Sequence, residues 1–285
     1  MEKQSKKRKF EEINQPSIKT FFSQHSSQDV SPPPSKRIRK NSEEEKSPSL
    51  KELLEFKPED MKSIEDYEGL FARIAHSLMN EHLLVVNTDY RYRICECEFY
   101  LNDVDAAKVH PDTFAHGDEM QRLSGQWYFH RFGKTFKSGT YKGLDLTFGK
   151  GKQAVGGILI RSIMSVGALN GKHLPPKDFV EGPCNSVTRI LKHNSPSDKD
   201  ITEVKDFVVL PGFSTDALAP TSNLLSLKAI REHTDEELKL LSNDIPTTLY
   251  RGPRVGLTLK RFDEHKCRFW MSDYRFVTQP HLNKK

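Results

Sequence analysis

The sequence predicts an α+β fold: a single domain with a mixed, largely antiparallel curved sheet flanked by helices, preceded by a disordered N-terminal arm. Two observations support this prediction. Segments with helical periodicity and segments with strand-like alternation follow each other irregularly, without a repeating βα order. The first fifty residues contain hardly any apolar side chains, which is typical of disorder. We therefore expect an arm over residues 1–50 and a domain over residues 51–285.

The arm combines charge with turn-forming residues. It holds eleven Lys and Arg against seven Asp and Glu, together with an SPPPS run and an EEEK cluster. Such a segment buries too little apolar surface to offset the entropy lost on ordering. Two basic clusters, Lys6–Lys9 and Lys36–Lys40, are of the kind that a nuclear import receptor binds. The arm therefore predicts a nuclear protein.

One short motif in the arm is apolar. Gln15, Ile18, Phe21 and Phe22 follow the pattern Q-x-x-I-x-x-F-F, which resembles the box that docks on the replication sliding clamp (PCNA). In a single helical turn the three apolar side chains lie on one face and form a plug, with the glutamine as a polar anchor beside it. We expect the clamp to be a partner, the alternative being a chance pair of aromatic residues.

The domain begins with helices. Residues 47–56 and 66–84 carry apolar residues at helical spacing, with Leu70, Ile74 and Leu78 on one stripe. A further short helix is predicted over residues 234–244, where Thr234 precedes acidic residues and serves as the N-cap.

Strands are predicted in three places. Residues 90–101 are rich in aromatic and alternating side chains, residues 156–163 are apolar enough for a buried strand, and residues 254–262 form a third candidate. In the first of these, alternation places Glu96, Glu98 and Tyr100 on one face. The alternate residues Cys95, Cys97 and Phe99 face the other side, which we expect to be core. In a generic strand the polar face would simply be exposed to solvent.

Charge and cysteine content restrict the class of protein. The domain is nearly neutral, yet residues 119–155 hold seven basic and two acidic side chains, and residues 250–285 hold nine and three. This favours one nucleic-acid-facing side, although ordinary variation in surface charge would look similar. The four cysteines form no CxxC pair, which argues against a disulfide framework and a structural zinc site. No apolar run approaches the ~20 residues that span a bilayer. We expect a monomer without metal or cofactor, and no membrane partner.

Five segments in order resemble one known family. They are RICECEFYL, MQRLSGQWYFHRFG, GGILIRSI, EGPCNSVTRIL and RGPRVGLTLK, and together they extend over residues 80–277. Their order and spacing resemble the alkyladenine (3-methyladenine type) DNA glycosylases. The resemblance implies a monofunctional glycosylase that flips a damaged purine out of double-stranded DNA and hydrolyses its N-glycosidic bond in base excision repair.

The resemblance also implies roles for individual residues. Glu98 matches the family's general base, Arg161 matches the arginine that helps hold the attacking water, and Tyr100 matches a stacking aromatic residue. No lysine falls among the matched pocket positions, so a Schiff base and strand cleavage by elimination are not expected.

Other matched positions depart from the family. His110, with His116 as the fallback, matches the pocket histidine, and His130 stands where the family has a second stacking tyrosine. Phe132 stands at the position of the wedge that fills the gap left by the flipped base. Asp145 replaces an asparagine of the base pocket, and because a carboxylate cannot donate a hydrogen bond, base selectivity should differ.

Basic residues near these motifs are the candidate phosphate contacts, and their contribution to binding should fall with salt. They are Arg122, Arg131, Lys134, Lys137, Lys142 and Arg254.

Two other functions stay open from the sequence. The first is a clamp-tethered DNA-binding lesion sensor or scaffold that lacks hydrolysis, which the altered pocket residues favour. The second is a clamp-binding adaptor whose domain binds protein only, which the basic segments make less attractive.

Overall fold

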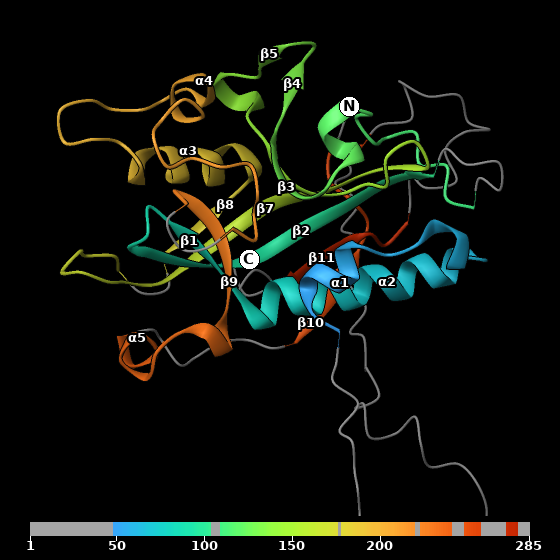
Figure 1. Cartoon of the computed structure of the whole chain (residues 1–285), viewed down its shortest axis with the longest axis horizontal. Helices are drawn as coiled ribbons and strands as arrows, with labels where there is room; N and C mark the ends of the chain where they lie inside the picture. Colours follow the sequence, from blue (N-terminus) through green and yellow to red (C-terminus); the bar gives the residue numbers. More distant parts are fainter. Residues whose placement is uncertain are drawn as a thin grey trace, which may run out of the picture.

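The protein is built on a large antiparallel sheet with helices beside it (Figure 1). The computed structural model describes residues 48–103, 109–175, 178–219, 223–240, 248–257 and 272–278. The import clusters and the clamp-binding motif, with Gln15, Ile18, Phe21 and Phe22, lie outside the described residues. The predicted α+β class with a largely antiparallel sheet is confirmed.

The main path of the sheet has the strand order β10-β11-β2-β7-β6-β3, with β1 pairing with β2 and β9, and β8 pairing with β7. The bounds of these strands are β1 His82–Val86, β2 Tyr90–Asp103, β3 Ser124–Phe129, β6 Leu144–Phe148, β7 Ala154–Ala168, β8 Phe179–Glu181, β9 Leu225–Ala229, β10 Leu249–Gly252 and β11 Arg275–Thr278. A separate hairpin consists of β4 Arg131–Phe132 and β5 Thr135–Phe136.

The described α-helices are α1 Leu50–Leu54, α2 Ile64–His76, α3 Pro183–His193, α4 Val204–Phe207 and α5 Asp235–Leu240, with single turns at Pro58–Asp60, Ser77–Glu81, Glu119–Arg122, Gly139–Tyr141 and Ile230–Glu232. Capping boxes begin the two helices that the sequence predicts first: Ser49 with Glu52 for α1, and Ser63 with Asp66 for α2. The predicted stripe of Leu70, Ile74 and Leu78 is buried.

Strands β2 and β7 form the long central pair of the sheet. Their register runs from Tyr90 opposite Ala168 to Asp103 opposite Ala154. Two bulges interrupt it near the middle: Cys95 is an extra residue on β2, and Arg161 is an extra residue on β7. A bulge turns side chains away from simple alternation and bends the strand locally. The candidate catalytic residues lie at this point of the sheet.

The hydrophobic core packs against one face of β2. The rings of Phe71 on α2 and Phe99 on β2 stack at 4.8 Å, and Cys97 lies in the same core cluster. The predicted core face of β2 is therefore confirmed for Cys97 and Phe99, whereas Cys95, the bulged residue, lies outside this cluster. The strand predicted over residues 156–163 lies within β7, and Thr234 caps α5 as predicted, since its hydroxyl accepts from the Glu237 N–H.

The strand predicted over residues 254–262 is wrong in its described part. Strand β10 ends at Gly252, and residues 254–257 form an irregular segment. Gly256 has φ of +80°, a left-handed conformation that interrupts an extended strand. The described cysteines Cys95, Cys97 and Cys184 are free thiols. Within the described ranges, every helix is too short or too polar to cross a bilayer.

Candidate active site

The polar face of β2 carries a buried carboxylate. Glu98 is 0% exposed, and the Tyr100 hydroxyl, two residues further along the same face, donates to its Oε2 at 2.7 Å. A carboxylate without access to water is costly unless hydrogen bonds and positive charge compensate it. The neighbours of Glu98 therefore decide what it can do.

The sequence predicted that Arg161 meets Glu98, and the structure places them together. Arg161 is the bulged residue of β7, and its Nε lies 3.4 Å from Oε1 of Glu98. The same Nε donates to Oε1 of Glu96 at 2.9 Å. The shorter distance goes to Glu96, so Glu98 shares the guanidinium rather than holding it alone.

Glu96 is a second buried carboxylate beside the first. It accepts from Arg275 on β11 as well as from Arg161, and from the Ser162 hydroxyl at 2.8 Å. Two carboxylates thus face two guanidiniums, and the four charges balance. Glu96 accepts the shorter contact from Arg161 and also a contact from Arg275, whereas Glu98 lies at the longer distance from the shared guanidinium.

Backbone completes the surroundings of Glu98. The N–H of Val255, in the irregular segment after β10, donates to Oε1 at 2.7 Å. Burial raises the pKa of Glu98 above its ordinary value, and the opposing effects of Arg161, Val255 and Tyr100 do not cancel this rise. A raised pKa lies closer to neutral pH, and a general base is most effective when its pKa is near the pH of the reaction.

Tyr100 is partly covered rather than free for stacking on both faces. The guanidinium of Arg254 lies 4.6 Å from its ring centroid, in cation–π contact. Arg254 itself is 1% exposed and pairs with buried Asp112. The prediction that Arg254 contacts DNA phosphates is therefore wrong for this conformation, because its guanidinium is buried and neutralised inside the domain.

A row of paired residues links Glu98 to the second half of the predicted pocket. Glu98 on β2 lies opposite Leu159 on β7, which lies opposite Asp145 on β6, which lies opposite Tyr128 on β3. Directly paired residues project to the same face of a sheet, with strands about 4.8 Å apart. Glu98 and Asp145 therefore flank the apolar Leu159, on the same face.

Asp145 is paired with His130, a contact that the sequence did not predict. Nε2–H of His130 donates to Oδ1 of Asp145 at 2.7 Å, and the Gln121 amide donates to Oδ2 at 3.0 Å. Asp145 is 2% exposed. Both of its oxygens are thus engaged by protein donors, so any effect of Asp145 on base selectivity would pass through these neighbours.

The first candidate for the pocket histidine, His110, lies in the core. His110 is 0% exposed, its Nδ1 bonds to the Leu101 carbonyl oxygen at 2.8 Å, and its ring packs between Tyr67 and Tyr274. It is a core histidine. His116, the fallback, lies instead against His130 with ring centroids 4.4 Å apart, and it retains an exposed edge.

The predicted wedge is exposed. Phe132 is 87% exposed on the hairpin β4–β5, whose turn contains Gly133 with φ of +57°. A large aromatic ring held in solvent on a short hairpin is unusual for a structural side chain. It is the geometry that insertion between bases requires.

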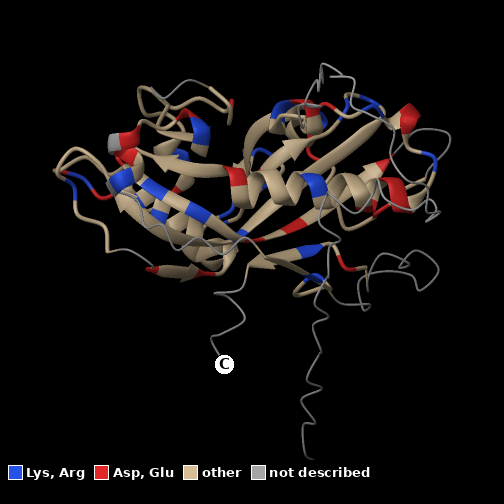
Figure 2. Cartoon of the chain, turned by 90° about the horizontal axis from the view of Figure 1, so that it is seen from below, with Lys and Arg blue, Asp and Glu red and all other residues tan. Residues whose placement is uncertain are grey.

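The remaining basic candidates differ in their exposure. Lys134 is exposed and Lys137 is half-buried, both near Phe132. Arg131 pairs with Asp118, and Arg122 donates to the Gly151 carbonyl oxygen. Lys142 is a correction: it is buried, and its Nζ donates to the Thr202 carbonyl oxygen at 3.1 Å, so it anchors a loop instead of facing phosphates. Figure 2 shows acidic and basic residues interspersed over strands and loops.

Sequence reasoning missed two members of the charge cluster. Glu96 carried a signal, because it shares the strand face of Glu98 two residues away. Arg275 carried none, because it comes from the last described strand and reaches Glu96 only through the pairing of β11 with β2.

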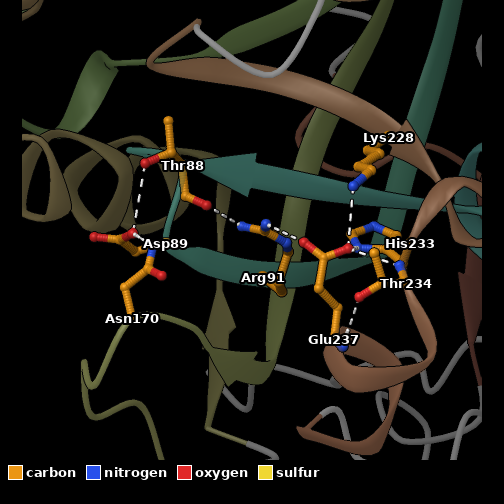
Figure 3. Close-up of polar contacts among 8 residues, drawn as sticks. All are labelled: Thr88, Asp89, Arg91, Asn170, Lys228, His233, Thr234 and Glu237. Carbon is orange, nitrogen blue, oxygen red and sulfur yellow. Dashed lines mark hydrogen bonds and ion pairs between the residues drawn. The ribbon is translucent and has the colours of Figure 1, made fainter.

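A second polar cluster lies away from this site (Figure 3). Arg91, Lys228 and His233 converge on one carboxylate, that of Glu237, which also caps α5 through the Thr234 N–H. It fastens a short helix to strands β2 and β9. Among the described residues, no group of three His, Cys, Asp or Glu side chains is arranged to hold a metal ion.

Comparison with known proteins gives one informative relative. No protein-family model matches the chain. An uncharacterized protein of Acanthamoeba polyphaga mimivirus is 33% identical over 213 residues, which covers 69% of this chain and 84% of the viral protein.

Proposed function

The chain belongs to the same family as this mimivirus protein, and from the geometry around Glu98 we propose that it is a monofunctional DNA glycosylase acting on damaged purines. The resemblance of five segments to the alkyladenine glycosylases supplies the reaction class. The observation that carries the proposal is the buried, incompletely neutralised Glu98, which shares Arg161 with Glu96.

In the proposed reaction, Glu98 takes a proton from a water molecule. The water oxygen forms a bond to the anomeric carbon, and the bond from that carbon to the purine nitrogen breaks. The electron pair leaves with the purine, which gains a proton from the solvent. The products are an abasic deoxyribose and a free base.

The surroundings of Glu98 suit this task. Burial raises its pKa, which makes it a stronger base when ionised, while Arg161 keeps the ionised form accessible. Because Arg161 is only 15% exposed, its charge acts with little screening by solvent. The same guanidinium would hold the ionised Glu98 in place while this carboxylate takes the proton of the attacking water.

Access to the anomeric carbon requires the nucleotide to leave the duplex. The exposed Phe132 would enter the gap and replace the lost stacking, at a cost of a few kcal/mol for unstacking that the inserted ring offsets. The exposed Lys134 beside it would contact phosphate.

The test is a panel of duplexes, each with one hypoxanthine, ethenoadenine or methylated purine, incubated with the full chain and then with alkali to cleave abasic sites. We expect cleavage at one or more lesions by the wild type. Glu98→Gln should lose about a thousandfold in rate while keeping DNA binding. Glu237→Gln is the matched control, because it makes the same change at a glutamate away from the site, and it should retain excision.

A non-catalytic lesion sensor is the second candidate, and one observation favours it. Glu98 is fully covered and accepts from both Tyr100 and Val255, so a water molecule must displace a neighbour to reach it. Tight lesion-selective binding without abasic product for any member of the panel would decide for the sensor.

The arm supplies the rest of the proposal. We propose that it directs the protein to the nucleus and to the sliding clamp, on the strength of its basic clusters and its clamp-binding motif. Changing Phe21 and Phe22 together to Ala should abolish binding to the clamp, measured by calorimetry with the full chain. Unchanged affinity would remove the clamp from the proposal.

A further inference from the structure

The hairpin that carries Phe132 leaves the sheet between β3 and β6. Its root is closed by backbone hydrogen bonds of one residue: the His130 N–H donates to the Gly143 carbonyl oxygen at 2.9 Å, and the Lys137 N–H donates to the His130 carbonyl oxygen at 2.9 Å. The strands beyond this root contain only two residues each. A hairpin this short is marginally stable by itself, so its direction depends on how the root is held.

The side chain of His130 fixes that root to the sheet. Its Nε2–H donates to Asp145, which belongs to the neighbouring strand β6 and is held in turn by Gln121. The imidazole–carboxylate bond is 2.7 Å long and partly buried, with the carboxylate side the more covered, which makes it a strong contact. Asp145 also stands in the row that contains Glu98, separated from it by Leu159.

Close packing leaves the His130 ring little freedom. A Cβ atom at Gly143 would lie 2.5 Å from Nδ1 of His130, so only glycine allows the ring to rest there. On another side His116 contacts the ring edge to face, at 4.4 Å. The ring is therefore held by a carboxylate, by a bare backbone position and by a second imidazole.

Two other contacts hold residues 130–143 to the rest of the domain at different points. Arg131 donates to Asp118, and Cys184 donates to the Gly139 carbonyl oxygen. The Arg131 N–H also donates to the hydroxyl of Tyr128, the last member of the row, at 3.4 Å. The bond from His130 to Asp145 is shorter, at 2.7 Å, and reaches the residue of the row that lies next to Leu159.

We propose that His130, held by Asp145, is a positioning residue that directs the Phe132 hairpin over the row of Glu98, so that insertion of the wedge and placement of the flipped purine occur together. This inference rests on the proposed function for its substrate, a damaged purine in a duplex. His130 acts through Phe132 and takes no part in the bond-breaking step.

The test compares one lesion in two settings: paired in a duplex, and in a bulge where it is already unstacked. Phe132→Ala should lose about thirtyfold in excision from the paired duplex and keep nearly wild-type excision from the bulge, because the wedge is needed only to replace stacking. His130→Asn should show the same pattern, and the double variant should be no worse than either single variant.

Three controls sharpen the comparison. Asp145→Asn keeps an oxygen that accepts from Nε2–H of His130. We therefore expect this variant to excise the paired lesion much faster than His130→Asn does. Glu98→Gln should lose excision equally in both settings. His193→Asn is the matched histidine control: His193 packs on Tyr90 and Tyr92, away from the hairpin, and its substitution should leave the ratio between paired and bulged substrates unchanged.

A second readout separates this inference from the proposed function. A 2-aminopurine next to the lesion reports unstacking without any chemistry, and we expect its signal with wild type to disappear in both Phe132→Ala and His130→Asn. If neither the wild type nor any variant excises a base but this fluorescence pattern holds, the proposed glycosylase activity is refuted and the positioning role stands. The positioning role is overturned if His130→Asn loses excision equally on paired and bulged lesions, or if this variant retains the fluorescence signal.

Discussion

Glu98 and Glu237 have similar partners, but their pKa values are shifted in opposite directions. Each accepts a backbone N–H and lies within 3.4 Å of an arginine nitrogen: Val255 and Arg161 for Glu98, Thr234 and Arg91 for Glu237. Burial raises the pKa of Glu98. Partial burial also opposes ionisation of Glu237, but the Thr234 N–H, Lys228 and His233 outweigh it and lower its pKa to about 2.

Two differences explain the contrast. Glu237 is 20% exposed and receives three basic side chains by itself (Figure 3), whereas Glu98 is fully buried and shares its arginine with Glu96. The two cations Arg91 and Lys228, together with access to water, therefore distinguish Glu237 from Glu98, because burial lowers the pKa of His233 to about 4 and leaves that ring neutral at pH 7. Glu237 is a fixed anion that holds α5, while Glu98 is able to exchange a proton.

Among substitutions of the neighbours of Glu98, the largest effect is expected from removing the shared arginine. Arg161→Gln takes away the main cation near Glu98, so its pKa should rise further and less of it is ionised at neutral pH. Excision should fall about a hundredfold at pH 7 and recover partly at higher pH, because ionised Glu98 is the base. The measurement is a pH–rate profile under single turnover. An unshifted profile would show that Arg161 does not control this carboxylate.

Glu237→Gln should weaken folding at neutral pH by about 2 kcal/mol, since Arg91 loses its partner in a buried position. The folded pKa is about 2 against an ordinary value of 4.5, so the stabilisation is present above pH 4.5 and is lost as pH falls toward 2. Denaturant unfolding at several pH values measures this. The difference between wild type and variant should shrink over that acidic window, and a constant difference would contradict the electrostatic account.

Glu98→Gln should act in the opposite direction. Because the folded pKa of Glu98 is raised, its favourable contribution is present below the ordinary value and is lost as pH rises through the folded pKa. At neutral pH the neutral amide should stabilise the protein by about 1 kcal/mol, a gain typical of substitutions at strained functional sites. Thermal unfolding at pH 7 gives the sign of this change in stability. A melting temperature of the variant below that of the wild type would show that the charge on Glu98 does not destabilise the fold.

The smallest effect concerns the second carboxylate of the cluster. Glu96→Gln removes the competitor for Arg161, so the cation should stabilise ionised Glu98 more strongly. The midpoint of the pH–rate profile should then move to lower pH, by less than about one unit. A shift to higher pH would mean that Glu96 helps Glu98 to ionise by holding Arg161 in place.

Parts of the fold followed from local sequence. The alternation in β2 predicted its two faces because a polar and an apolar set occupy alternate positions, and the caps of α1, α2 and α5 are local hydrogen bonds. The strand expected after residue 254 failed because alternation cannot detect a left-handed glycine or a buried ion pair. Arg254 reaches Asp112, which lies 142 positions earlier in the chain.

The site was predictable in part. Glu98, Arg161, His130 and Asp145 were found through segments that resemble the alkyladenine glycosylases, and the structure brings them together in two adjoining pairs. His110 was chosen over His116 by position along one loop, yet loop position does not determine which ring turns toward the core. The sharing of Arg161 depends on strand pairing and on a bulge, neither of which leaves a local pattern in the sequence.

The two bulges at the centre of the sheet also constrain how this family can vary in length. Cys95 adds a residue to β2 and Arg161 adds one to β7, and together they return the strands to matched pairing from Cys97 onward. Losing either residue alone would shift the pairing by one position and move Glu98 to the opposite face relative to its partners. Insertions and deletions near these positions should therefore be inherited as compensated pairs, one in each strand, and an aligned homologue that shortens only one strand should have lost the Glu98 chemistry.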